Sequence, residues 1–208
     1  MRAQGGSIGR FDRSLPRCFG KFDDEAMEFT SRVATAKDEN QLRKVMDAAI
    51  GDLQRGFLTN DQIASSRAIM GIDHQLIADG TYYVVEHDGV VAGCGGWSRR
   101  ATLYGNDSTP GRDSQLLDPD VDAARVRAMY TAPTYARRGV GWLILELCER
   151  AAAAEGFTRL ELMGTLSGQP LYTKYGFVPR EHVDDDRGGA AVPLVRMEKP
   201  VDRALLRR

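Results

Sequence analysis

The most constraining feature of the sequence is a strand pattern, a glycine-bearing turn and a long helix pattern that follow one another in its second half. Residues 125–131 are typical of a β-strand, and residues 139–155 have helical apolar spacing that ends at Gly156. A second strand is predicted over residues 158–163. Because two strands joined through a helix lie parallel in one sheet, the segment predicts a β-α-β unit with a right-handed crossover.

Helices are predicted closer to the N-terminus. A short strand over residues 27–33 leads to Thr35 and Asp38, which resemble the capping box of an amphipathic helix. A second helical region spans residues 60–79 and contains Gly71, where a break is expected.

A hairpin and a long loop follow. Asp88 and Gly89 form a turn signal between the strand patterns over residues 81–86 and 90–97. Residues 99–122 are polar and rich in turn residues, which predicts a surface loop. Three elements complete the chain: a short helix over residues 169–175, a strand from Phe177, and a final strand over residues 192–198.

Length and composition predict one domain. The chain has 208 residues, of which 42% are hydrophobic, enough for one ordinary core. We expect a disordered extension over residues 1–26, a single domain over residues 27–200 and a tail over residues 201–208.

Charge and cysteine content limit the partners. Lys and Arg total 28 against 29 for Asp and Glu, so no global field favours nucleic acid or an anionic membrane. The three cysteines are scattered and have no metal-ligand spacing, which disfavours a disulfide scaffold or a metal site and favours a reducing compartment. No apolar run approaches the roughly 20 residues of a membrane span. A cytoplasmic protein is therefore expected.

The turn before the predicted helix is a candidate anion site. Residues 136–141 place two glycines where a helix begins, so free N–H groups and the positive end of the helix dipole face a ligand. Arg137 and Arg138 add positive charge at the same place. A phosphate or pyrophosphate is the natural ligand, although glycines with neighbouring arginines also occur in ordinary solvated turns.

The order of the predicted elements and two motifs resemble the GCN5-related N-acetyltransferase (GNAT) superfamily. Residues 136–141 match its R/Q-x-x-G-x-G/A acyl-CoA motif at both glycines, but Ala136 stands where Arg or Gln is common. Its L-Y-x-x-x-G-F segment is matched by Leu171, Tyr172, Gly176 and Phe177. The resemblance implies an α/β (α+β) fold with a mixed, mostly antiparallel sheet and a central β-α-β unit that binds acyl-CoA, flanked by helices.

The resemblance also implies a cofactor site and a reaction, the transfer of an acetyl or other acyl group from acyl-CoA to an amine. The main chain of the strand would hold the pantetheine arm and polarise the thioester carbonyl, and the glycine turn would hold the pyrophosphate. The cofactor-binding residues implied are Met129, Tyr130, Thr131, Arg137, Arg138, Gly139, Val140, Gly141 and Trp142.

Tyr172 matches the tyrosine that protonates the departing thiolate in many relatives. The alternative is a buried aromatic residue whose hydroxyl bonds to the backbone. For the general base, Asp122, Glu161 and Glu86 are candidates, and a chain of water molecules is equally plausible. The loop from about Leu103 to Asp122 is expected to influence which amine is accepted.

Other functions remain in competition. A dinucleotide-binding turn would require a third glycine where Ile144 stands, and the Gly-Lys-Ser/Thr of a P-loop is absent from the sequence. A non-catalytic acyl-CoA-binding regulatory module is the stronger alternative, because Ala136 departs from the motif and the base is unassigned. The acceptor is a small-molecule or peptide amine, no metal is expected, and a homodimer is left open.

Overall fold

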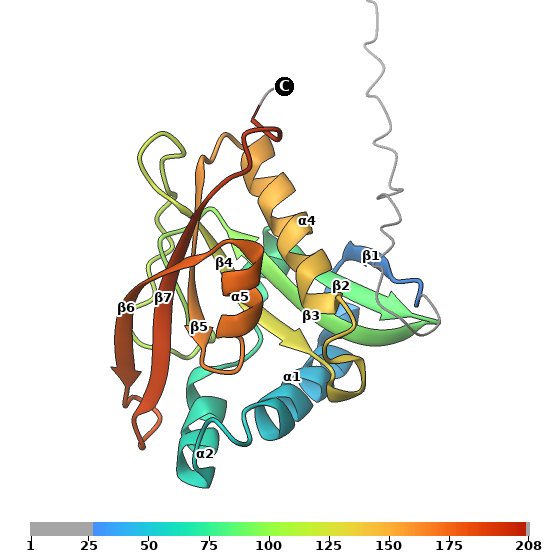
Figure 1. Ribbon diagram of the computed structural model, residues 1–208, viewed down its shortest axis with the longest axis vertical. Coiled ribbons are helices and arrows are strands. Elements are labelled where there is room, and N and C mark those ends of the chain that lie inside the picture. Colours follow the sequence, from blue (N-terminus) through green and yellow to red (C-terminus); the bar gives the residue numbers. More distant parts are fainter. Residues whose placement is uncertain (1–26, 207–208) are drawn as a thin grey trace, which may run out of the picture.

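The computed structural model describes residues 27–206, and the expected extension over residues 1–26 lies outside them. Seven strands form one sheet in the order β1-β2-β3-β4-β5-β7-β6 (Figure 1). Only the pairing of β4 with β5 is parallel, and every other neighbouring pair is antiparallel. The predicted mixed, mostly antiparallel sheet is confirmed.

The elements lie close to their predicted bounds. The strands are β1 (Thr30–Val33), β2 (Tyr82–His87), β3 (Val90–Ser98), β4 (Ala124–Thr131), β5 (Arg159–Thr165), β6 (Val178–Asp185) and β7 (Val192–Pro200). The α-helices are α1 (Glu39–Leu53), α2 (Asn60–Ile69), α3 (His74–Ala78), α4 (Val140–Ala154) and α5 (Gln169–Tyr175), with short 3-10 helices at Ala36–Asp38 and Pro133–Tyr135.

Local signals account for several of these bounds. The capping box of Thr35 and Asp38 is present, with the Thr35 N–H donating to Asp38 Oδ2 at 2.7 Å, although it begins a 3-10 helix that continues into α1. Asp88 and Gly89 both have positive φ in the turn between β2 and β3. The second helical region is divided into α2 and α3, as Gly71 suggested.

Two helices cover opposite faces of the sheet. Alternate residues of β2 separate the two sides, because Tyr83 and Val85 belong to the core under α4 while Tyr82 and Val84 belong to the core under α1. The β4-α4-β5 unit therefore lies at the centre of the molecule with α1 on its far side (Figure 1). The packed chain continues past Pro200, since Val201 is buried and its N–H donates to the Thr158 carbonyl at 2.9 Å.

Candidate active site

The central parallel strands separate along their length. Pairing between β4 and β5 runs only from Ala124 with Leu160 to Val126 with Leu162. Strand β4 nevertheless continues to Thr131, so its second half has no strand partner on the β5 side. An extended backbone edge with free donors and acceptors is suited to pair with a linear ligand.

A β-bulge lies where β4 separates from β5. The register between β3 and β4 shifts between Cys94 and Gly96, and Ala128 has φ of 50°, a left-handed conformation uncommon for a residue with a Cβ. The hydroxyl of Tyr82, on the face of the sheet that α1 covers, donates a 2.8 Å hydrogen bond to the Ala128 carbonyl. Gly95 leaves room for the bulge, because a Cβ there would lie 2.8 Å from Met129 Cγ.

The glycine turn between β4 and α4 is built from two left-handed residues. Arg137 has φ of 65° and Gly139 has φ of 93°, and α4 begins at the next residue. A Cβ on Gly139 would meet no atom within 4 Å, so this position faces open space. At Gly141 a Cβ would lie 2.6 Å from Leu171 Cδ2, so the lack of a side chain at this glycine also allows α4 and α5 to pack closely.

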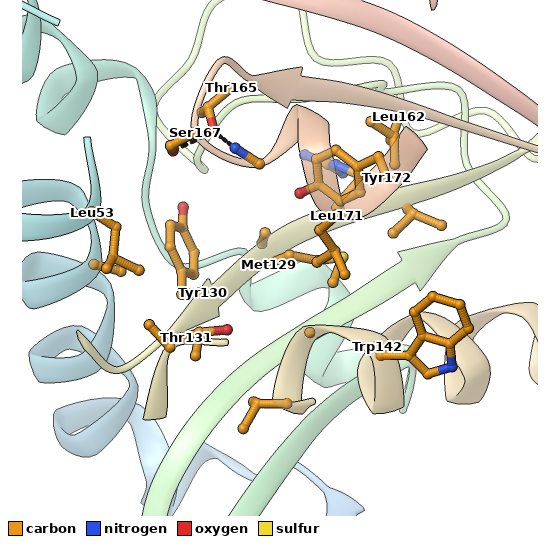
Figure 2. Close-up of a pocket in the computed structure, with 18 of the residues that line it drawn as sticks. Leu53, Met129, Tyr130, Thr131, Trp142, Leu162, Thr165, Ser167, Leu171 and Tyr172 are labelled. Carbon is orange, nitrogen blue, oxygen red and sulfur yellow. Dashed lines mark hydrogen bonds between the residues drawn. The ribbon is translucent and has the colours of Figure 1, made fainter. Parts of the chain in front are cut away.

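The unpaired end of β4, the bulge and the glycine turn all line one cleft of about 1390 Å³. Every residue predicted to bind the cofactor, from Met129 to Trp142, lines it together with Tyr172. Figure 2 shows Thr131, Trp142 and Tyr172 around this cleft, with Leu53 on its other side.

The cleft has two ends of different chemistry. We call the residues from the turn, α4 and α5 the cofactor end: Arg137, Arg138, Gly139, Trp142, Arg150 and Lys174. The apolar end comes from α1, α2, β7 and the loops: Leu53, Phe57, Ile69, Met70, Leu103 and Leu194. Tyr130 and Met129 of β4 lie between the two ends (Figure 2).

The hydroxyl of Tyr172 has no hydrogen-bond partner among the described residues, whereas the hydroxyl of its neighbour Tyr175 has one. The Tyr172 ring packs against Phe177 at 6.2 Å between centroids, and Figure 2 shows its hydroxyl turned toward the side that holds Tyr130. Burial raises the pKa of Tyr172 to about 12, so the phenol is protonated at neutral pH. The Tyr175 hydroxyl instead donates to the buried carboxylate of Glu149 at 2.7 Å.

None of the carboxylates considered as bases lines the cleft. Glu161 is buried and paired with Arg125 and with Arg196, the latter at 2.7 Å. Glu86 is paired with Arg32 at 2.8 Å, and Asp122 accepts the Asp118 N–H at 2.8 Å. Each therefore has a structural partner outside the cleft lining.

One carboxylate does line the cleft within the described residues, namely Glu146 of α4. It lies at the cofactor end, where its Oε1 accepts a 3.0 Å hydrogen bond from Trp142 Nε1.

A buried ion pair ties the bulged strand to its surroundings and was not predicted. Arg127 of β4 and Asp73 are both almost fully buried and lie 2.7 Å apart, and Arg112 of the long loop contacts Asp73 at 3.1 Å. Arg127 also donates to the Gly105 carbonyl at 3.0 Å. The partners are separated by up to 54 positions in the sequence, so no local motif could have signalled this contact.

No helix over residues 27–206 is long and apolar enough to cross a membrane. In the same range, no group of three or more His, Cys, Asp or Glu side chains could hold a metal ion.

Several solved structures with the same fold carry the name of an acetyltransferase. A GCN5-related N-acetyltransferase from Rhodopseudomonas palustris is 19% identical with a TM-score of 0.62, covering 82% of this chain and 94% of its own. The PaiA N-acetyltransferase of Thermoplasma acidophilum, solved with coenzyme A, is 16% identical with a TM-score of 0.57, covering 84% and 99%. YncA of Salmonella typhimurium, solved with acetyl-CoA, is 16% identical with a TM-score of 0.56, covering 84% and 95%.

Comparison of the sequence with curated proteins found no match. Comparison with family models did find one. The family model described as the acetyltransferase (GNAT) family matches residues 47–177, more than half of the chain, and that range includes β4, the glycine turn and Tyr172. The chain therefore belongs to the GNAT acetyltransferase family.

Proposed function

We propose that this protein is an N-acyltransferase that moves an acetyl or other acyl group from acyl-CoA to a primary amine by direct attack, with Tyr172 as the general acid. The observation that carries the proposal is that one cleft holds the unpaired end of β4, the glycine turn before α4 and the unpartnered hydroxyl of Tyr172.

The cofactor end fits the phosphates of coenzyme A. The open space over Gly139 and the free N–H groups at the start of α4 suit a pyrophosphate, and the exposed side chains of Arg137 and Arg138 supply positive charge. Ala136 adds no side-chain donor, so the backbone carries more of the binding here than in relatives with Arg or Gln. The structures of PaiA with coenzyme A and YncA with acetyl-CoA support this assignment at the level of the fold.

The edge of β4 and the bulge suit the thioester. A backbone N–H of Met129, Tyr130 or Thr131 would donate to the thioester carbonyl oxygen, where negative charge builds as the amine attacks. The new C–N bond forms while the C–S bond breaks, and the sulfur leaves as a thiolate. Tyr172 donates its hydroxyl proton to that sulfur and is later reprotonated from solvent.

The amine must also lose a proton. Because Asp122, Glu161 and Glu86 lie outside the cleft lining, we infer that this proton leaves through water and not through a dedicated carboxylate. One proton leaves the amine and one reaches the thiol, so the reaction is balanced without another co-reactant.

The proposed setting is the cytoplasm. Cys94 and Cys148 are free and buried, as expected of a protein in a reducing compartment.

A CoA-release assay with purified protein, acetyl-CoA and a panel of amines tests the proposal. We expect free thiol to accumulate only when an acceptor amine is present. Binding of acetyl-CoA without thiol release for any amine would instead support the non-catalytic acyl-CoA-binding module. That alternative is favoured by Ala136, which departs from the family motif, and by the lack of an assigned general base.

A further inference from the structure

The apolar end of the cleft contains features that bear on the acceptor. Its side chains come from the end of α1, the turn after it, the end of α2, the long loop and β7. Phe57 is 51% exposed, and Leu53 faces the cleft opposite Tyr130 (Figure 2). Large apolar side chains left open in a concave site gain by burying an apolar ligand.

Nearly all charged side chains that line the cleft lie at the cofactor end and not at the apolar end. Among the described residues that line it, the basic side chains other than Arg127 belong to the cofactor end, and Arg127 is already paired with buried Asp73. The lining carboxylate, Glu146, also lies at the cofactor end, on α4. A second ammonium group on an acceptor would therefore enter the apolar end without a carboxylate partner, which is unfavourable.

The polar groups at the apolar end are neutral. Gln54 is 5% exposed, its Nε2 contacts Met70 Sδ at 3.5 Å, and its Oε1 has no hydrogen-bond partner among the described residues. Tyr130 donates only a long hydrogen bond, 3.4 Å, to the Gly71 carbonyl. A neutral amide and a phenol discriminate by shape and hydrogen bonding, not by charge.

From these observations we propose that the acceptor is a primary amine with an apolar body and no second cationic group. This inference rests on the proposed acyl transfer and specifies the substrate class of the same site. Leu53, Met70 and Leu103 bury the body of the amine, and the reacting nitrogen points toward Tyr130 and Tyr172.

A matched pair of amines tests the inference. Hexylamine and cadaverine have the same chain length and the same reacting amine, but cadaverine carries an ammonium where hexylamine carries a methyl group. We expect kcat/KM with acetyl-CoA to favour hexylamine by roughly tenfold or more, because an unpaired ammonium loses its hydration at the apolar end whereas a methyl group gains from burial. Calorimetry on the CoA-saturated protein should show the same order of affinity.

Two variants sharpen the test. Leu53→Glu places a carboxylate at the apolar end, so the preference for hexylamine should fall at least about tenfold or reverse, with the thermal shift by acetyl-CoA kept. Leu116→Glu adds the same charge on a loop leucine that is 61% exposed and outside the cleft lining, and should leave the preference unchanged.

The possible failures can be told apart. Equal turnover of both amines, or faster turnover of cadaverine by the wild-type protein, overturns the inference and leaves acyl transfer standing. An equal loss of preference in both variants also overturns it, because a distant charge would then act as well as a local one. Binding of acetyl-CoA without transfer to these or any other amines overturns the proposed function and the inference together.

Discussion

The cofactor end and the apolar end of the cleft differ in what holds a ligand. The cofactor end depends on backbone: the positive φ of Arg137 and Gly139, the start of α4 and the unpaired edge of β4. The apolar end depends on side chains such as Leu53 and Met70 from segments far apart in the chain. The left-handed positions of the turn restrict which residues fit there, whereas an apolar wall tolerates volume-conserving changes. Substitutions should therefore be tolerated poorly at the proposed donor site and better at the proposed acceptor site.

Tyr172 and Tyr175 offer the largest expected effect, because both lie on α5 but only Tyr172 lines the cleft. Tyr172→Phe keeps the ring and removes the proton, so kcat should fall by roughly 10²–10⁴-fold with little change in acetyl-CoA affinity or melting temperature. Tyr175→Phe is the matched control, since it removes a hydroxyl bonded to buried Glu149. It should lower stability by about 1.5–3 kcal/mol and leave kcat nearly unchanged.

Steady-state kinetics, calorimetry and melting curves on both variants decide the comparison. Unchanged turnover of Tyr172→Phe would end its role as the acid.

The bulge of β4 gives the next effect, because it joins the two ends. Tyr82→Phe removes the hydrogen bond to the Ala128 carbonyl, so the bulge should relax and kcat should fall by roughly 10–10²-fold, less than the 10²–10³-fold cost of losing an oxyanion donor. Adding Ala128→Gly should restore kcat, because glycine adopts a φ of 50° without strain. Tyr83→Phe, on the opposite face of β2, is the control.

A double variant no more active than Tyr82→Phe alone would show that the hydroxyl does not act through the bulge.

The two glycines of the turn separate binding from packing. Gly139→Val should strain a left-handed residue by about 1–2 kcal/mol and place a side chain in the open space for phosphate, raising the Kd for acetyl-CoA by roughly tenfold or more. Gly141→Val should instead press on Leu171 and lower the free energy of unfolding by about 1–3 kcal/mol. Titration calorimetry and urea unfolding measure both quantities, and identical behaviour of the two variants would refute the distinction.

The smallest effect concerns the loop beside the apolar end. His74 contacts Asp107 of this loop at 2.5 Å and Glu39 of α1 at 3.3 Å, and the hydrogen bond to Asp107 raises the pKa of the imidazole. A group whose pKa is raised in the folded state stabilises the fold at pH values below its unfolded pKa, which is near 6.5 for histidine. This stabilisation is lost as the pH rises through the folded pKa. Because His74 is half exposed, the gain should not exceed about 1 kcal/mol.

Urea midpoints of the wild-type protein and His74→Gln should therefore diverge at acid pH and converge above neutrality. A constant difference across this range would contradict the assignment.

The residues that the sequence predicted for the cofactor end line one cleft in the structure, and their signals in the sequence are local. The strand over residues 125–131, the two glycines and the Leu171-Tyr172 segment each act through neighbours a few positions away. The signals for a general base are not local. Glu161 of β5 is paired with Arg196 of β7, a strand near the end of the chain, so the sequence around Glu161 could not show that its carboxylate already has a partner. The family motif likewise suggested a shared role for both glycines, yet only the structure shows that Gly141 faces Leu171.

The apolar end could not be predicted for a physical reason. Leu53 continues the apolar face of α1 and Met70 follows α2, so in sequence both are indistinguishable from core residues. In the structure both line the cleft to which the separated end of β4 also contributes. Arg127 was visible as a charged residue within a strand, but its partner Asp73 lies in a connection before α3.

The most direct test of acyl transfer identifies both products of one reaction. The protein is incubated with acetyl-CoA and hexylamine, and the free thiol is titrated while mass spectrometry measures the amine. We predict equimolar CoA thiol and N-acetylated amine, with both lost together in Tyr172→Phe. Thiol release without acetylated amine would show hydrolysis instead of transfer, and no thermal shift at saturating acetyl-CoA would contradict the account at its first step.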